Sequence, residues 1–160
     1  DIYQQHLEPF FESHFLRGKK IVLDCAHGAA WLLAPKVFEH FGAEIIALHN
    51  KPNGLNINKQ CGAVHPQALQ KAVAAHHADI GFAFDGDGDR VIAVNKHGQL
   101  KNGDDILALF LAHPAYKETK TVVGTSMTNQ GFENYLVKQG KSLIRAHVGD
   151  KYVAQDMVKH

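Results

Sequence analysis

The sequence predicts an α/β protein, a mixed sheet with helices packed on it, followed by a second and truncated α/β unit. Short apolar runs of strand length alternate along the chain with longer segments whose apolar residues recur at helical spacing. Turns rich in glycine and asparagine separate these segments. With 160 residues, 45% of them apolar and 21% charged, the chain has the composition of a globular protein.

The first segments predict a β-α-β unit. Residues 2–16 are expected to form an amphipathic helix that Gly18 closes. The apolar run 19–24 predicts a strand, and Pro35 is expected in the first turn of the helix that follows. Residues 43–49 predict the second strand. Strands joined in this way normally lie parallel and side by side.

A long polar loop and a second pair of strands come next. Residues 50–65 form the loop, and loops of this length are usually functional or disordered. Pro66 opens a helix with apolar residues at helical spacing. Residues 78–84 predict a strand with its large side chains on one side, and residues 91–94 predict another strand.

A change of composition near residues 95–105 predicts a domain boundary, which gives domains 1–98 and 99–160. An apolar helix that Pro114 ends, a strand, a helix that Gly140 ends and a further strand follow. The last helical pattern has no C-terminal cap. We therefore expect the chain to be a fragment of a longer protein.

Composition narrows the range of partners. The net charge of +1 gives no reason to expect nucleic acid or an anionic membrane as a partner. The twelve histidines are scattered and show no metal-ligand spacing. Cys25 and Cys61 form no CxxC pattern, which favours neither a disulfide framework nor a zinc site and suits the cytoplasm. No apolar run reaches the ~18 residues that a membrane span requires.

The strongest functional pattern is the stretch FAFDGDGDRVIAV, residues 82–94. Asp85, Asp87 and Asp89 alternate with two glycines at the end of a predicted strand, and Arg90 follows directly. Carboxylates at this spacing repel one another unless a positive partner lies among them.

Four interpretations compete. A calcium loop of the EF-hand type requires glycine at its sixth position and glutamate at its twelfth, where Arg90 and Lys96 stand. A phosphatase would use Asp85 as nucleophile and Asp87 as acid and base, but Asp89 stands where such motifs have Thr or Val. A hairpin turn explains one Asp-Gly pair and not three alternating carboxylates.

The fourth interpretation, a divalent metal ion held by the three carboxylates, explains the pattern best. The glycines let the backbone curl until all three side chains point inward. Oxygen ligands favour Mg²⁺, which typically keeps positions for water or a phosphate oxygen. Arg90 offers the planar donor fork that suits phosphate. The metal ion is then the positive partner, and together with Arg90 it predicts a site for phosphoryl transfer.

These residues resemble a known family. FDGDGDR, preceded by ADIGFA, resembles the metal-binding loop of the α-D-phosphohexomutase superfamily. Four further stretches are similar to its phosphoglucosamine mutase branch: VLDCAHGAA, NGLNINKQCGAVHP, VVGTSMTNQG and RAHVGDKYV. They follow the order of that family and span essentially the whole chain.

The resemblance implies a fold and a set of site residues. Residues 1–98 would be the second of the domains that surround one active site, and the remainder the start of the third. Asp85, Asp87 and Asp89 would ligate one Mg²⁺ ion, with a phosphoserine oxygen of the first domain as a further ligand. Arg90 would be catalytic, in contact with the phosphoryl group in transit.

The implied activity is that of an isomerase and intramolecular phosphotransferase. Such an enzyme interconverts glucosamine 6-phosphate and glucosamine 1-phosphate through a phosphoserine enzyme and a hexosamine 1,6-bisphosphate, and it serves the synthesis of cell-wall precursors in the cytoplasm. The implied partners are the phosphosugar and the other domains of the parent chain, and the oligomeric state is not predicted.

Alternatives stay open at this point. A phosphomannomutase or phosphoglucomutase of the same superfamily is the nearest, followed by an aspartyl-phosphate phosphatase and by a non-catalytic metal- or phosphate-binding module. The phosphoserine loop, the sugar-recognising loop and the last phosphate-binding loop of the family are absent from the sequence. We therefore expect this chain alone to turn over nothing.

The chain departs from the family pattern at several positions. His27 stands where asparagine is usual, and for it and for His65 we expect loop hydrogen bonding rather than a chemical role. Ala63 and Val64 stand where Ser-Thr is common. His147 occupies a place often held by lysine, and Lys151 replaces an arginine. The resemblance implies that both contact substrate or phosphate, with a charge at His147 that depends on pH.

Overall fold

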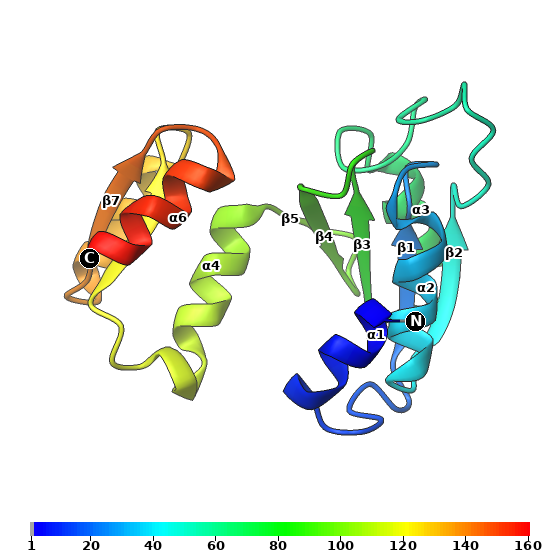
Figure 1. The fold of residues 1–160 in the computed structure, drawn as a ribbon, viewed down its shortest axis with the longest axis horizontal. Helices are drawn as coiled ribbons and strands as arrows, with labels where there is room; N and C mark the ends of the chain where they lie inside the picture. Colours follow the sequence, from blue (N-terminus) through cyan, green and yellow to red (C-terminus); the bar gives the residue numbers. More distant parts are fainter. Residues whose placement is uncertain (1) are drawn as a thin grey trace. The chain divides into compact units, whose positions relative to one another are not determined.

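The structure, a computed structural model, describes residues 2–160 (Figure 1). The chain forms two compact units, Asp1–Asn102 and Gly103–His160. The first unit contains a five-stranded sheet and the second a two-stranded sheet. Within the described residues, no helix is long and apolar enough to cross a membrane.

The first unit alternates helices and strands as far as β3 and then continues with two short antiparallel strands. Its elements are α1 (Ile2–Leu7), a 3₁₀ turn (Glu8–Phe10), β1 (Lys20–Asp24), α2 (Ala30–His40), β2 (Glu44–Leu48), α3 (Gln67–Ala75), β3 (Ile80–Phe84), β4 (Val91–Asn95) and β5 (Leu100–Lys101).

The sheet of the first unit is mixed, as predicted. Its strand order is β2-β1-β3-β4-β5. Strand β1 pairs in parallel with both β2 and β3, so that Val22 lies between Ile46 and Gly81. Strands β4 and β5 are antiparallel to their neighbours. The β-α-β unit predicted for the first strands is confirmed.

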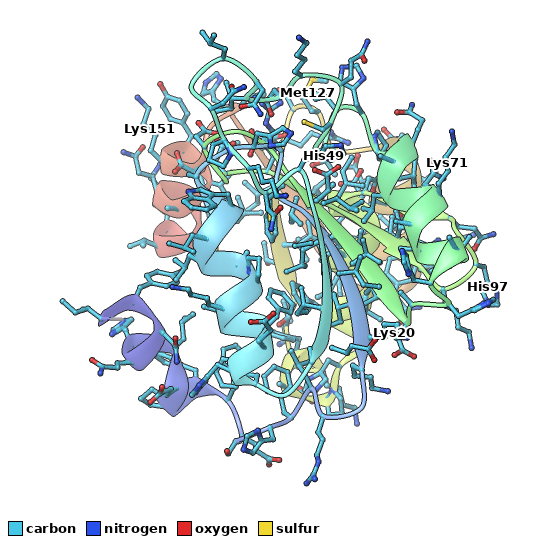
Figure 2. All side chains as sticks on the ribbon, turned by 90° about the vertical axis from the view of Figure 1, so that its right-hand side faces the viewer. Lys20, His49, Lys71, His97, Met127 and Lys151 are labelled. Carbon is cyan, nitrogen blue, oxygen red and sulfur yellow. The ribbon has the colours of Figure 1, made fainter. Side chains whose placement is uncertain are left out.

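Each face of this sheet carries its own apolar core, because successive residues of a strand point to opposite faces. Helix α3 covers one face, where Val22 packs with Leu69 and Val73. Helix α2 covers the other face, where Leu23 packs near Phe38. Figure 2 shows the two helices on opposite sides of the sheet.

The helix predicted for residues 2–16 is wrong in length. Helix α1 ends at Leu7, and a 3₁₀ turn that contains Pro9 follows it. Proline has no backbone N–H and disfavours the α conformation at the residue before it, so the helix stops here despite its apolar periodicity.

The predicted position of Pro35 is also wrong. Helix α2 begins at Ala30 rather than at Pro35, so this proline lies inside the helix. It removes the hydrogen bond to the carbonyl of Trp31, one turn earlier, and Trp31 lies on an exposed part of the helix. The alanine and leucine residues before Pro35 favour helix strongly enough to extend it upstream.

The second unit begins a new α/β arrangement. Its elements are α4 (Gly103–Ala112), a 3₁₀ turn (Pro114–Tyr116), β6 (Thr121–Thr125), α5 (Gln130–Lys138), β7 (Ser142–Ala146) and α6 (Asp150–Lys159). Strands β6 and β7 are parallel. Val122, Phe132 and Leu136 form the buried core, against which side chains of α4 pack.

Candidate functional site

The candidate site lies at one edge of the five-stranded sheet. Strands β1, β2 and β3 are parallel, so their carboxyl ends meet at this edge, where open α/β sheets bind ligands. The loops 25–29, 49–66 and 85–90 follow these three strands. Figure 2 shows His49 at this edge, with Lys20 at the opposite end of the strands.

Backbone hydrogen bonds hold the three loops together. They join Ala29 N to Gly86 O (2.8 Å), Asn58 N to Ala26 O (2.9 Å), His27 N to His49 O (2.6 Å) and Ala63 N to Phe84 O (2.9 Å). These contacts connect segments that are distant in the sequence, and each satisfies a donor and an acceptor that would otherwise require water. The loops after β1, β2 and β3 are therefore joined to one another by backbone hydrogen bonds at this edge of the sheet.

Glycine is required where the loops approach one another. A Cβ atom on Gly28 would overlap the backbone of Gly86. One on Gly86 would lie 2.6 Å from Nδ2 of Asn58 and 2.8 Å from Cδ1 of Ile57. Gly28 therefore leaves no room for a side chain, and a side chain at Gly86 would have to displace those of Asn58 and Ile57.

Several non-glycine residues of these loops have left-handed backbone. They are Ala26 (φ 53°), His27 (φ 48°), His49 (φ 47°), Asn58 (φ 56°) and Gln60 (φ 53°). This conformation costs about 1 kcal/mol or more per residue and persists only where the surroundings impose it. Because strain of this kind clusters at functional sites, it supports a functional role for the edge.

The aspartate loop, residues 85–90, connects β3 to β4 as a hairpin. The hairpin interpretation is therefore right about the backbone. It leaves the carboxylates unexplained, because oxygens of Asp85, Asp87 and Asp89 lie within 4.8 Å of one another. Asp85 is only 1% exposed, whereas the other two are exposed. The structure thus brings the three predicted ligands together.

Arg90 is a positive partner of this cluster. Its Nε donates to Oδ2 of Asp85 at 2.7 Å, and its backbone N donates to Oδ1 at 3.0 Å. The same Nε lies 3.5 Å from Oδ1 of Asp89. The chain itself therefore supplies one positive charge to the cluster, through the arginine that the sequence predicts to lie beside the metal ion.

The pKa values reflect this crowding. Burial acts to raise the pKa of Asp85, but the hydrogen bonds from Arg90 outweigh it and lower the pKa overall. The hydrogen bond that Asp89 shares with Asp85 raises the pKa of Asp89. The hydrogen bond to Asp85 raises the pKa of Arg90. One guanidinium thus serves a site with three carboxyl groups, and a further cation would relieve the repulsion.

The residues present fit a divalent metal ion. Each carboxylate oxygen has two lone pairs, and Arg90 occupies one on each oxygen of Asp85. One further lone pair per oxygen lies beside the exposed carboxylates of Asp87 and Asp89, and a metal ion would replace the hydrogen bond that Asp85 shares with Asp89. An all-oxygen donor set of this kind suits Mg²⁺ or Mn²⁺.

Replacing Arg90 with glutamine is expected to raise the pKa of Asp85 in metal-free protein, because burial then acts with less opposition. In the unsubstituted chain, ionised Asp85 stabilises the fold at pH values above the pKa of an unfolded aspartate, about 3.9. This stabilisation is lost as the pH falls through the lower pKa of Asp85 in the folded state. In the variant, the stabilisation from Asp85 should be lost at a higher pH. Carboxyl-carbon NMR titration measures the shift.

Arg145→Gln is the matched control, since Arg145 pairs with Glu133 in the second unit at 2.7 Å. It should raise the pKa of Glu133, which the hydrogen bond from Arg145 lowers, and leave that of Asp85 unchanged. An unaltered Asp85 pKa in Arg90→Gln would contradict the assigned pairing.

His147 and Lys151 lie together in the second unit. Both are exposed, at the carboxyl end of β7 and in the first turn of α6. The ring of His147 meets that of Tyr152 edge to face, with centroids 5.7 Å apart, and Nζ of Lys151 lies 4.7 Å from the Tyr152 centroid. The two predicted phosphate contacts thus share one aromatic neighbour.

Asp24 is a buried carboxylate at this edge that the sequence reasoning did not single out as a candidate site residue. Its carboxylate is fully buried at the end of β1, where Oδ1 accepts from Ala26 N (3.0 Å) and Oδ2 from Gly62 N (3.1 Å). Nδ1 of His49 lies 3.0 Å from the same Oδ2. The signal in the sequence was a carboxylate at the end of a buried strand, the same context as Asp85.

His27 has the role expected from the sequence. Its Nδ1 accepts a hydrogen bond from the backbone N of Lys51 at 3.2 Å, and its ring lies edge to face with that of His49, with centroids 5.3 Å apart. His27 therefore links the loop after β1 to the loop after β2.

Cys25 and Cys61 are both fully buried free thiols. Burial, aided by the charge of Asp24, raises the pKa of Cys25 to about 12 and also raises that of Cys61. Compared with a free cysteine, Cys25 should hold on the order of a thousandfold less thiolate. We expect Ellman's reagent to modify neither thiol in the folded chain and both after unfolding in denaturant. Rapid modification of the folded chain would contradict this burial.

The fold and the site define a class of protein. The parallel strands, the connected loops at their carboxyl edge and the cluster of acidic residues around Arg90 are those of an α/β protein that binds ligands at that edge. Residues 1–98 match the family described as phosphoglucomutase/phosphomannomutase, alpha/beta/alpha domain II, and residues 102–160 match domain III of the same family. The chain belongs to the phosphoglucomutase/phosphomannomutase family, and the resemblance predicted from its motifs is confirmed.

Individual relatives agree with this assignment. Over 154 residues the chain is 51% identical to a phosphoglucosamine mutase of Acinetobacter baumannii, covering 96% of this chain and 34% of that protein. It is 49% identical over 147 residues to a phosphoglucosamine mutase of Symbiobacterium thermophilum, covering 90% and 33%. The crystal structure of a phosphoglucomutase/phosphomannomutase family protein from Burkholderia thailandensis superposes with a TM-score of 0.82 at 26% identity, covering 99% of this chain and 35% of that one. The chain spans about a third of the length of these curated relatives.

Proposed function

We propose that this chain forms the metal- and phosphate-binding part of a phosphoglucosamine mutase. Such an enzyme interconverts glucosamine 6-phosphate and glucosamine 1-phosphate through a phosphoserine and a hexosamine 1,6-bisphosphate intermediate. The observation that carries the proposal is the 51% identity over 154 residues to a protein of that name. The aspartate loop supports it, because its carboxylates and Arg90 are the groups that phosphoryl transfer requires.

Asp85, Asp87 and Asp89 would hold a Mg²⁺ ion, which would neutralise charge on the transferred phosphoryl group. Arg90 fixes the orientation of Asp85 through Nε and the backbone N–H. A guanidinium has five N–H donors, so Arg90 has others to offer a phosphate oxygen while it holds Asp85. The side chain thereby links the metal ligand to the phosphoryl group.

His147 and Lys151 are proposed contacts for a substrate phosphate. Both are exposed at the start of α6, so a phosphate in solution can reach either side chain. The cytoplasm is the proposed compartment, since a reducing environment suits two buried free thiols.

A domain-replacement chimera tests the proposed function. The chain would replace its counterpart in the Acinetobacter baumannii phosphoglucosamine mutase, and conversion of glucosamine 6-phosphate would be measured. We expect the chimera to be active. Asp85→Asn in the chimera should reduce turnover by at least about a hundredfold, because several kcal/mol of charge stabilisation are lost.

Other outcomes would favour the alternatives. A folded but inactive chimera would argue against the proposal, and a preference for glucose or mannose phosphates would favour a phosphoglucomutase or phosphomannomutase. Release of phosphate from a phosphate ester by this chain alone, lost in Asp85→Asn, would favour an aspartyl-phosphate phosphatase.

A further inference from the structure

A second group of candidate metal ligands lies at the same edge of the sheet as the aspartate loop. Asp24 ends β1, His49 follows β2, and Cys61 belongs to the long loop that precedes α3. A carboxylate oxygen, an imidazole nitrogen and the thiol sulfur of these residues lie within 4.8 Å of one another. They come from three separate segments, so sequence spacing gave no sign of the group.

Two of the three residues are fully buried, His49 is half-buried, and the group contains an unsatisfied nitrogen. Asp24 and Cys61 are both 0% exposed. Nδ1 of His49 is shielded from solvent and has no hydrogen-bond partner among the described residues, although it lies only 3.0 Å from Oδ2 of Asp24. The atoms are close enough to interact but are not aligned for a hydrogen bond. Buried polar atoms without a partner are uncommon in folded proteins, and a bound cation would satisfy this nitrogen through its lone pair.

The donor atoms suit a borderline metal ion rather than Mg²⁺. Asp24 accepts one backbone N–H on each oxygen, which leaves a lone pair on each. A cation bound at the Cys61 sulfur would displace the thiol proton and neutralise the resulting thiolate. Carboxylate, imidazole and thiolate together are ligands of zinc.

We propose that Asp24, His49 and Cys61 bind a zinc ion, with water in the remaining position of a tetrahedral site. The ion would stabilise the position of the aspartate loop. The residues after Cys61 are already bonded to Asp24 and to the end of β3, through Gly62 N and Ala63 N. An ion on Cys61 fixes this segment against Phe84, the residue directly before the aspartate loop.

Cobalt titration tests the proposal, because Co²⁺ replaces zinc and absorbs in the near ultraviolet when bound to a thiolate. The titration uses the reduced, metal-free chain carrying Asp85→Asn, Asp87→Asn and Asp89→Asn, so that the first site does not compete. We expect one Co²⁺ ion per chain with a sulfur-to-cobalt band that zinc abolishes. A saturating titration without this band would overturn the proposal.

Matched variants assign the ligands. Cys61→Ser should abolish the band and Cys25→Ser, at the other buried thiol, should leave it intact. His49→Gln should weaken Co²⁺ affinity by at least about tenfold, whereas His65→Gln, at an exposed histidine, should not. Loss of the band in Cys25→Ser, or unchanged affinity in His49→Gln, would overturn the assignment.

Thermal unfolding gives a second measurement that does not depend on the spectrum. Zinc should raise the Tm of the aspartate-substituted chain and not that of its His49→Gln counterpart, because only an ion bound to the folded state stabilises it. Equal zinc effects on the two chains would overturn the proposal. Because the three aspartates of the loop are substituted in both chains, failure of this test does not bear on the proposed mutase function.

Discussion

Replacing Asp85, Asp87 and Asp89 together with asparagine is expected to abolish specific Mn²⁺ binding by this chain. Asparagine keeps the size of the side chain and one oxygen but removes all three charges from oxygens that lie within 4.8 Å of one another. Mn²⁺ shares the preference of Mg²⁺ for oxygen ligands and is paramagnetic, so the signal of free Mn²⁺ in EPR measures binding directly. Among the single variants, Asp85→Asn should weaken binding most, because Asp85 is the buried and oriented ligand.

A charge-matched variant is the control for this experiment. Glu12, Glu39 and Glu118 are exposed, and their replacement with glutamine also removes three negative charges. This control should bind Mn²⁺ as the unsubstituted chain does, which separates specific ligation from general attraction. Equal binding by both triple variants would place the metal elsewhere on the chain, and no binding by the unsubstituted chain would show that the loop alone is insufficient.

Most of the strands could be predicted because their sequence pattern matches one local rule. In β3, Ile80, Phe82 and Phe84 point to the face that α2 covers, and Ala83 points to the other. The alternation of large and small residues indicated this arrangement before the structure was known. The small residues are explained only by the structure, since a Cβ on Gly81 would lie 2.7 Å from Cδ1 of Leu69.

The errors in the helices have a physical cause. Apolar periodicity predicts which residues share a face, but it does not fix where a helix begins and ends. Pro9 ends α1 early although apolar residues continue beyond it. Pro35 is tolerated inside α2, where one lost hydrogen bond is outweighed by the packing of Ala34 and Phe38 on the sheet.

The two candidate metal sites differ in how far the sequence alone predicts them. Asp85, Asp87, Asp89 and Arg90 are close in the sequence, so one loop defines their cluster and residue types alone predicted it. The contact between Arg90 and Asp85 required the hairpin, which turns the arginine back onto the first aspartate. Asp24, His49 and Cys61 meet only because β1 and β2 are adjacent and the long loop folds over both, which a sequence pattern does not contain.

Replacing Gly62 with alanine is expected to destabilise the first unit by about 2–4 kcal/mol. Gly62 has φ +74°, a left-handed conformation that alanine disfavours. Its Cβ would also lie 2.5 Å from the carbonyl oxygen of Phe84 and 2.6 Å from Cβ of Ala26. Relief of this overlap must separate the long loop from β3 or from the loop after β1, and either movement weakens the bond from Gly62 N to Asp24.

Gly98→Ala separates the two contributions. Gly98 has nearly the same backbone conformation, φ +75°, but no atom of the described residues lies within 4 Å of where its Cβ would be. It should therefore cost only about 1 kcal/mol, the backbone contribution alone. Denaturant unfolding followed by the fluorescence of Trp31, the one tryptophan of the chain, reports on the first unit and measures both values. If the two variants lose the same free energy, the close approach of Gly62 to β3 does not hold in solution, and the aspartate loop would lack the support that this contact gives it.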